Sequence, residues 1–150
     1  MASELQLTKT RLYRVDQDIA LAVYQADEGR RSRIVQTVVG LGIERSGLVE
    51  DRVLGAYAQL RNGASVQQLI ESVQSAVADL DEAAWTAQDS WDAGNGSELS
   101  YAVAFAKARA ASAVAFAMKK TTKDSLDAVY EASFAIDDLE LLRRSVQGVH

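Results

Sequence analysis

Apolar residues recur every three or four positions along most of the chain, which is the spacing of amphipathic helices. Glycines and helix-capping residues interrupt this pattern and predict about six separate helices. The expected bounds are about Thr8 to Asp27, a shorter helix that breaks in the glycine-rich stretch 40–47, Val49 to Arg61, Ser65 to Ala93, Ser97 to Met118, and Thr121 to Val146. The pattern therefore indicates an all-α fold.

Length and composition support one helical unit. The 150 residues include no proline, and the β-branched runs typical of a sheet are missing. A chain of this size can bury roughly 70% of its unfolded surface around one core. We therefore expect a single-domain bundle over residues 1–150.

The fifth predicted helix is alanine-rich, with nine alanines among the seventeen residues from Tyr101 to Ala117. Alanine favours helix and lets neighbouring helices approach closely, so we expect this helix at the centre of the bundle. A buried charge there must be paired. Arg109 is therefore expected to pair with Asp79 or Asp81 of the fourth helix or to contact an anionic ligand.

The fourth predicted helix carries the longest apolar stripe of the chain. Its members project within about 40 to 60° of one line when each residue turns by 100°. They are Val66, Leu69, Ile70, Val73, Ala76, Val77, Leu80, Ala84, Ala87 and Trp91. The whole stripe, including Trp91, is predicted to face the core.

Trp85 projects about 140° away from Leu80 on the same helix. Three carboxylates project on the same side as Trp85: Glu82, Asp89 and Asp92. An exposed tryptophan within an acidic rim is typical of a protein-binding surface, because tryptophan is enriched at binding hot spots and charge raises association rates. The alternative is that another helix, such as the N-terminal one, covers Trp85.

Residues suited to catalysis or metal binding are scarce. The chain has no cysteine, and its one histidine is His150. Carboxylates spaced three or four apart on helices lack the Glu-x-x-His motif of di-iron bundles and are interpreted as solvated faces. Gly40 and Gly42 lack the third glycine of a dinucleotide loop and are interpreted as a helix break. We expect no enzyme activity, no metal and no cofactor.

Negative charge is concentrated in the middle of the chain. The formal net charge is -5, and residues 51–100 hold two basic and eight acidic side chains. This argues against a nucleic-acid ligand and favours a basic protein partner. The N-terminus lacks the apolar stretch of a signal peptide, and Lys107 and Arg109 interrupt the apolar fifth helix. We expect a soluble, cytoplasmic protein that does not enter membranes.

Two stretches carry a family resemblance: LRNGASV at residues 60–66 and AKARAASAVAFAMKKTTKDSLDAVYEASFA at residues 106–135. Over about residues 51–135 the chain resembles an alanine-rich, all-helical family of immunity proteins from bacterial polymorphic toxin systems. The family's Ala-Arg-Ala-Ala motif and its alanine-flanked tyrosine would correspond to Arg109 and Tyr130. Lys119 and Lys123 stand where the family often has histidines.

The resemblance implies a non-catalytic antitoxin that binds and neutralises a cognate toxin. The acidic patch around Trp85 agrees in direction with this, since it suits a basic toxin. Two alternatives remain open from the residues. The same patch could form a homodimer, or the alanine-rich helix could leave a cavity in which Arg109 meets a small anionic ligand.

Overall fold

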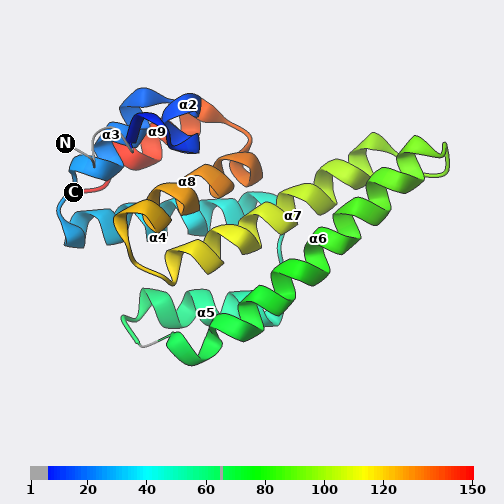
Figure 1. Cartoon of the computed structure of the whole chain (residues 1–150), viewed down its shortest axis with the longest axis horizontal. Helices are drawn as coiled ribbons and strands as arrows, with labels where there is room; N and C mark the ends of the chain where they lie inside the picture. Colours follow the sequence, from blue (N-terminus) through cyan, green and yellow to red (C-terminus); the bar gives the residue numbers. More distant parts are fainter. Residues whose placement is uncertain (1–6, 65) are drawn as a thin grey trace.

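The computed structural model describes residues 7–64 and 66–150, and all regular structure within them is helical (Figure 1). The all-α prediction is confirmed, but these residues form eight α-helices and one short 3-10 helix, where about six helices were expected. They are α2 (Arg11–Val15), α3 (Gln17–Gln25), α4 (Glu28–Ser46), α5 (Asp51–Arg61), η1 (Gln67–Leu69), α6 (Ile70–Asp92), α7 (Glu98–Ala117), α8 (Thr122–Ile136) and α9 (Leu139–Gln147).

Two of the predicted helices, Thr8 to Asp27 and Thr121 to Val146, are each divided into two helices at an aspartate. Asp16 adopts an extended backbone, and its carboxylate accepts a hydrogen bond of 3.0 Å from the Ile19 amide, so α3 begins anew after α2. Burial of Asp16 opposes ionisation, but this bond and a hydrogen bond from Arg143 lower its pKa. Asp137 takes a left-handed conformation (φ 51°), and Asp138 then caps α9. Local capping by aspartate overrides the helical spacing at both places.

The predicted break at Gly40 and Gly42 is wrong. Helix α4 runs through both glycines and ends at Gly47, which has a φ of 71°. A Cβ atom at position 40 would overlap the hydroxyl of Tyr57, which donates a 2.8 Å hydrogen bond to the Gln36 carbonyl. At Gly42 the same atom would lie 3.5 Å from the Cβ of Ala135 on α8. Gly40 therefore allows close packing of Tyr57 within a continuous helix, whereas a side-chain methyl at position 42 would make only an ordinary van der Waals contact.

The core lies where α4, α8 and the second half of α7 pack together (Figure 1). Nearly all residues of α7 from Ala108 to Val114 are buried, as are Val38 and Val39 of α4 and Val129 of α8. Small alanine side chains on α7 allow the neighbouring helices to approach it closely. The alanine-rich helix is thus central only over its second half.

The short helix η1 leads directly into α6. Ser65, the predicted start of this helix, lies outside the described residues. The antiparallel hairpin of α6 and α7 then projects well beyond the other helices (Figure 1). We call residues 82–106, which form the distal half of this hairpin, the arm. All residues from 91 to 100 are exposed, and Gly94 closes the turn with a φ of 79°. Trp91, predicted to face the core, is 40% exposed because no third helix among the described residues packs against this end.

Candidate functional site

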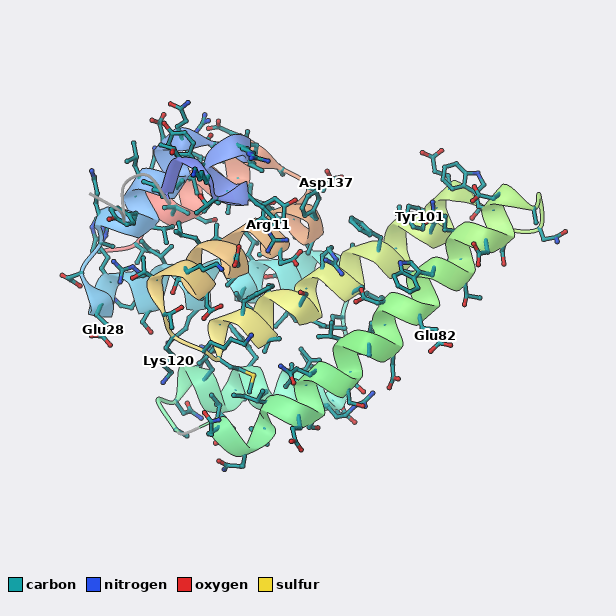
Figure 2. The ribbon with its side chains drawn as sticks, in the orientation of Figure 1. Arg11, Glu28, Glu82, Tyr101, Lys120 and Asp137 are labelled. Carbon is teal, nitrogen blue, oxygen red and sulfur yellow. The ribbon has the colours of Figure 1, made fainter. Side chains whose placement is uncertain are left out.

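The outer face of α6 on the arm carries the predicted binding residues. Trp85 is 69% exposed, so no described helix covers it, and Glu82, Asp89 and Asp92 are exposed as well. Figure 2 shows Glu82 pointing away from α7. Within residues 7–64 and 66–150, none of these three carboxylates forms an ion pair. We call these four residues the tryptophan patch.

The charge of the hairpin has one sign over a long stretch. No lysine, arginine or histidine occurs between Arg61 and Lys107, whereas this stretch holds seven acidic residues. Unpaired carboxylates along a projecting element produce a negative field that attracts basic surfaces. The negative charge thus extends beyond the tryptophan patch to Glu71 and Glu98, whereas Asp79 and Asp81 pair with Arg52 and Arg109.

The inner face of the arm carries a row of aromatic rings. The centroids of Trp91 and Tyr101 are 6.0 Å apart in a stacked arrangement, and those of Tyr101 and Phe105 are 5.8 Å apart. The row continues onto α8, where Phe134 lies 5.8 Å from Phe105, and Tyr130 lies 5.0 Å from Phe134. These rings connect the tip of the arm to the body of the protein.

A groove of about 530 Å³ lies along this row, between the arm and the C-terminal end of α8. We call it the aromatic groove. Its lining includes Trp91, Val103 and Phe134, which are 40%, 42% and 38% exposed. Figure 2 shows Tyr101 of the arm and Asp137 of the body on either side of it. Sequence reasoning missed this groove because it assigned Trp91 and the alanine-rich helix to the core; the spacing of Tyr101 and Phe105 by four residues was the available signal.

An ion-pair cluster joins the base of the arm to the body. Arg109 donates to Asp81 at 2.6 Å and to both carboxylate oxygens of Glu131 on α8, at 3.0 and 3.2 Å. Glu131 is only 4% exposed and also accepts from the Ser112 hydroxyl at 3.2 Å. Burial opposes the charge on Arg109, but Glu131 and Asp81 together raise its pKa. Asp79, the other expected partner, pairs with Arg52 at 2.9 Å instead.

The residues named in the family resemblance lie in three places: Arg109 within α7, Lys119 between α7 and α8, and Lys123 and Tyr130 on α8. The guanidinium carbon of Arg11 lies 4.4 Å from the ring centroid of Tyr130, and Arg11 also pairs with Asp127 at 3.1 Å. Lys119 stands 5.4 Å above the Phe116 ring. Arg11 of α2 therefore lies against α8. It does not cover Trp85, which is 69% exposed.

Neither a metal cluster nor a membrane span is found in the part of the chain that the structure describes. No group of three or more histidine, cysteine, aspartate or glutamate side chains there could hold a metal ion. No described helix is both long and apolar enough to cross a membrane. No protein-family model, curated protein or solved structure matches the chain.

Proposed function

We propose that this chain is a protein-binding inhibitor of the immunity type, which binds a basic toxin through the arm and neutralises it. The observation that carries this proposal is the exposure of Trp85, 69%, on an element that projects from the body, among three carboxylates that form no ion pair within the described residues. The resemblance to immunity proteins supports the choice of a toxin as the partner.

The physical basis is the combination of a large apolar anchor with a charged rim. A tryptophan offers roughly 200 Å² of surface, so covering the exposed part of Trp85 contributes about 3 kcal/mol of transfer free energy. The carboxylates of Glu82, Asp89 and Asp92 contribute less to affinity, because exposed ion pairs are weak. Their main effect is to speed the approach of a basic partner and to fix its orientation.

The alternatives receive less support from the geometry. A small anionic ligand at Arg109 would compete with Asp81 and Glu131, which already bind the guanidinium. A homodimer through two arms would bring together two hairpins that each carry acidic residues and no basic ones between Arg61 and Lys107. Like charges brought face to face oppose association.

The test compares the natural chain with a Trp85→Ala, Asp89→Ala double variant in capture from lysate of its native host, followed by mass spectrometry. We expect one basic protein to be retained by the natural chain and lost with the double variant. The matched control is Thr86→Ala, an exposed residue of the same helix that lies about 100° from Trp85.

Thermal unfolding of the same variants separates binding from folding. Both the double variant and Thr86→Ala should melt close to the natural chain, because the substituted side chains are exposed. Capture of the same partner by the double variant would contradict the proposal. If the natural chain retains a partner and the double variant does not, the natural chain is mixed with the purified partner at equimolar ratio. This measurement shows whether the chain suppresses the toxic activity of the partner.

A further inference from the structure

We propose that the aromatic groove is a second docking surface, and that it takes the apolar face of a lysine- or arginine-rich amphipathic helix of the partner. This inference rests on the proposed function, since it describes further contacts of the same basic protein. It concerns a different side of the arm, because Trp91 of the groove projects about 120° from Trp85 on α6, so the two surfaces can be tested separately.

The groove has the dimensions and lining that an apolar helix face requires. Successive rings from Trp91 through Tyr101 and Phe105 to Phe134 are 5.8 to 6.0 Å apart. A helix presents side chains on one face at about 5.4 Å per turn, so one apolar residue per turn can meet one ring. The row spans several such steps between α7 and α8, and Val103 adds an aliphatic contact.

Charge selects a basic helix as the occupant. Glu98 and Asp137 line the groove, and neither forms an ion pair within the described residues. The lining also contains one basic residue, Arg45, whose Nε donates to the Ile136 carbonyl at 2.7 Å, so the lining as a whole carries one more negative than positive charge. The adjoining hairpin adds further carboxylates and no basic side chain up to Lys107. A helix with lysines or arginines beside its apolar face can therefore place the apolar face on the aromatic rings and its cations near Glu98 and Asp137.

A second copy of this chain is the competing occupant. Arm-to-arm pairing would place two uniformly acidic segments beside each other, which the charge pattern opposes. Sedimentation of the free protein distinguishes the two occupants. A concentration-independent monomer is expected, and a dimer that dissociates on Val103→Asp would overturn the proposal in favour of self-association.

The binding test uses the full chain carrying Trp85→Phe, which leaves Trp91 as its single tryptophan. The probe is an amphipathic peptide of leucine and lysine, about 18 residues or five helical turns long, with a visible dye. One control peptide has the same composition in scrambled order, and another has glutamate in place of lysine. Anisotropy gives the Kd, and the emission of Trp91 reports on the groove.

We expect the leucine–lysine peptide to bind more tightly than either control and to shift Trp91 emission to shorter wavelength. Val103→Asp should raise its Kd by about tenfold, because a charge then lies in the apolar groove. Leu99→Asp is the matched control on an exposed residue of α7 outside the groove lining, and it should change the Kd by less than about twofold. Both variants add one negative charge, which by itself favours a lysine peptide.

Phe134→Asp on the opposite wall provides a second variant, and circular dichroism checks that each variant is folded. Equal Kd values for Val103→Asp, Phe134→Asp and Leu99→Asp would overturn the groove assignment, as would equal binding of the three peptides. Because the tryptophan patch lies on a different side of the arm, the Trp85→Ala, Asp89→Ala capture result would still decide the proposed function independently.

Discussion

The two halves of α7 show how one helix serves two different surroundings. From Ala108 onward the helix is packed against α4, α6 and α8, and its alanines are buried. Before Ala108 the helix runs antiparallel to α6 and touches α8 through Phe105, whose ring lies 5.8 Å from that of Phe134. The aromatic residues Tyr101 and Phe105 stand on one side of this half. A segment that projects with large side chains partly exposed contributes little to the core. The contrast indicates that the body stabilises the fold and that the arm is available for binding.

The largest expected effect comes from breaking the ion-pair cluster that joins the two regions. Arg109→Met leaves Glu131 buried without its main partner, so we expect a loss of about 3 to 5 kcal/mol in the free energy of unfolding. Urea unfolding measures this. Adding Glu131→Gln to Arg109→Met should recover part of the loss, because the buried charge is then removed.

The control for that measurement is Arg52→Ala, which breaks a pair with Asp79 on the exposed side of α6. Solvent screens such a pair, so little change in stability is expected. Equal destabilisation by Arg109→Met and Arg52→Ala would contradict the distinction between a buried junction and an exposed ion pair.

A smaller effect is expected from enlarging alanines in the two regions. Ala111→Leu adds volume where the residue is fully buried between helices, and overpacking there should cost about 1 to 3 kcal/mol. Ala83→Leu makes the same change on an exposed site of the arm and should change stability by about 0.5 kcal/mol or less. Thermal unfolding of both variants provides the comparison. If Ala83→Leu proved as costly as Ala111→Leu, the arm would be as tightly packed as the body.

The structure also shows which features could be predicted from the chain alone. Helical spacing and caps predicted α5, α7, the end of α6 and the start of α8 within a few residues, since these signals are local. The end of α8 was missed by ten residues, because the left-handed Asp137 divides the predicted helix into α8 and α9. The continuous course of α4 was missed because Gly40 leaves room for the hydroxyl of Tyr57 on α5. This is a contact between two helices, which the local sequence does not show. Glycine signals alone cannot separate a helix end from a close approach.

The same distinction applies to the candidate site. Projection on a single helix placed Trp85 away from the apolar stripe but left open whether another helix covers it. The exposure of Trp85, 69%, depends on how the hairpin projects from the body. The pairing of Arg109 with Glu131 and the contact of Phe105 with Phe134 depend on where α8 lies against α7. Spacing within one helix carries no information about that arrangement, so the aromatic groove became visible only in three dimensions.

The smallest expected effect separates the two tryptophans of the arm. Trp91→Ala removes the ring stacked on Tyr101 and should cost about 1 kcal/mol, the usual contribution of an aromatic pair. Trp85→Ala removes a side chain that is 69% exposed and should change stability by about 0.5 kcal/mol or less. Chemical unfolding of the two variants under identical conditions measures the difference. A larger loss for Trp85→Ala than for Trp91→Ala would mean that Trp85 stabilises the hairpin itself, and its exposure would then no longer indicate a surface kept for a partner.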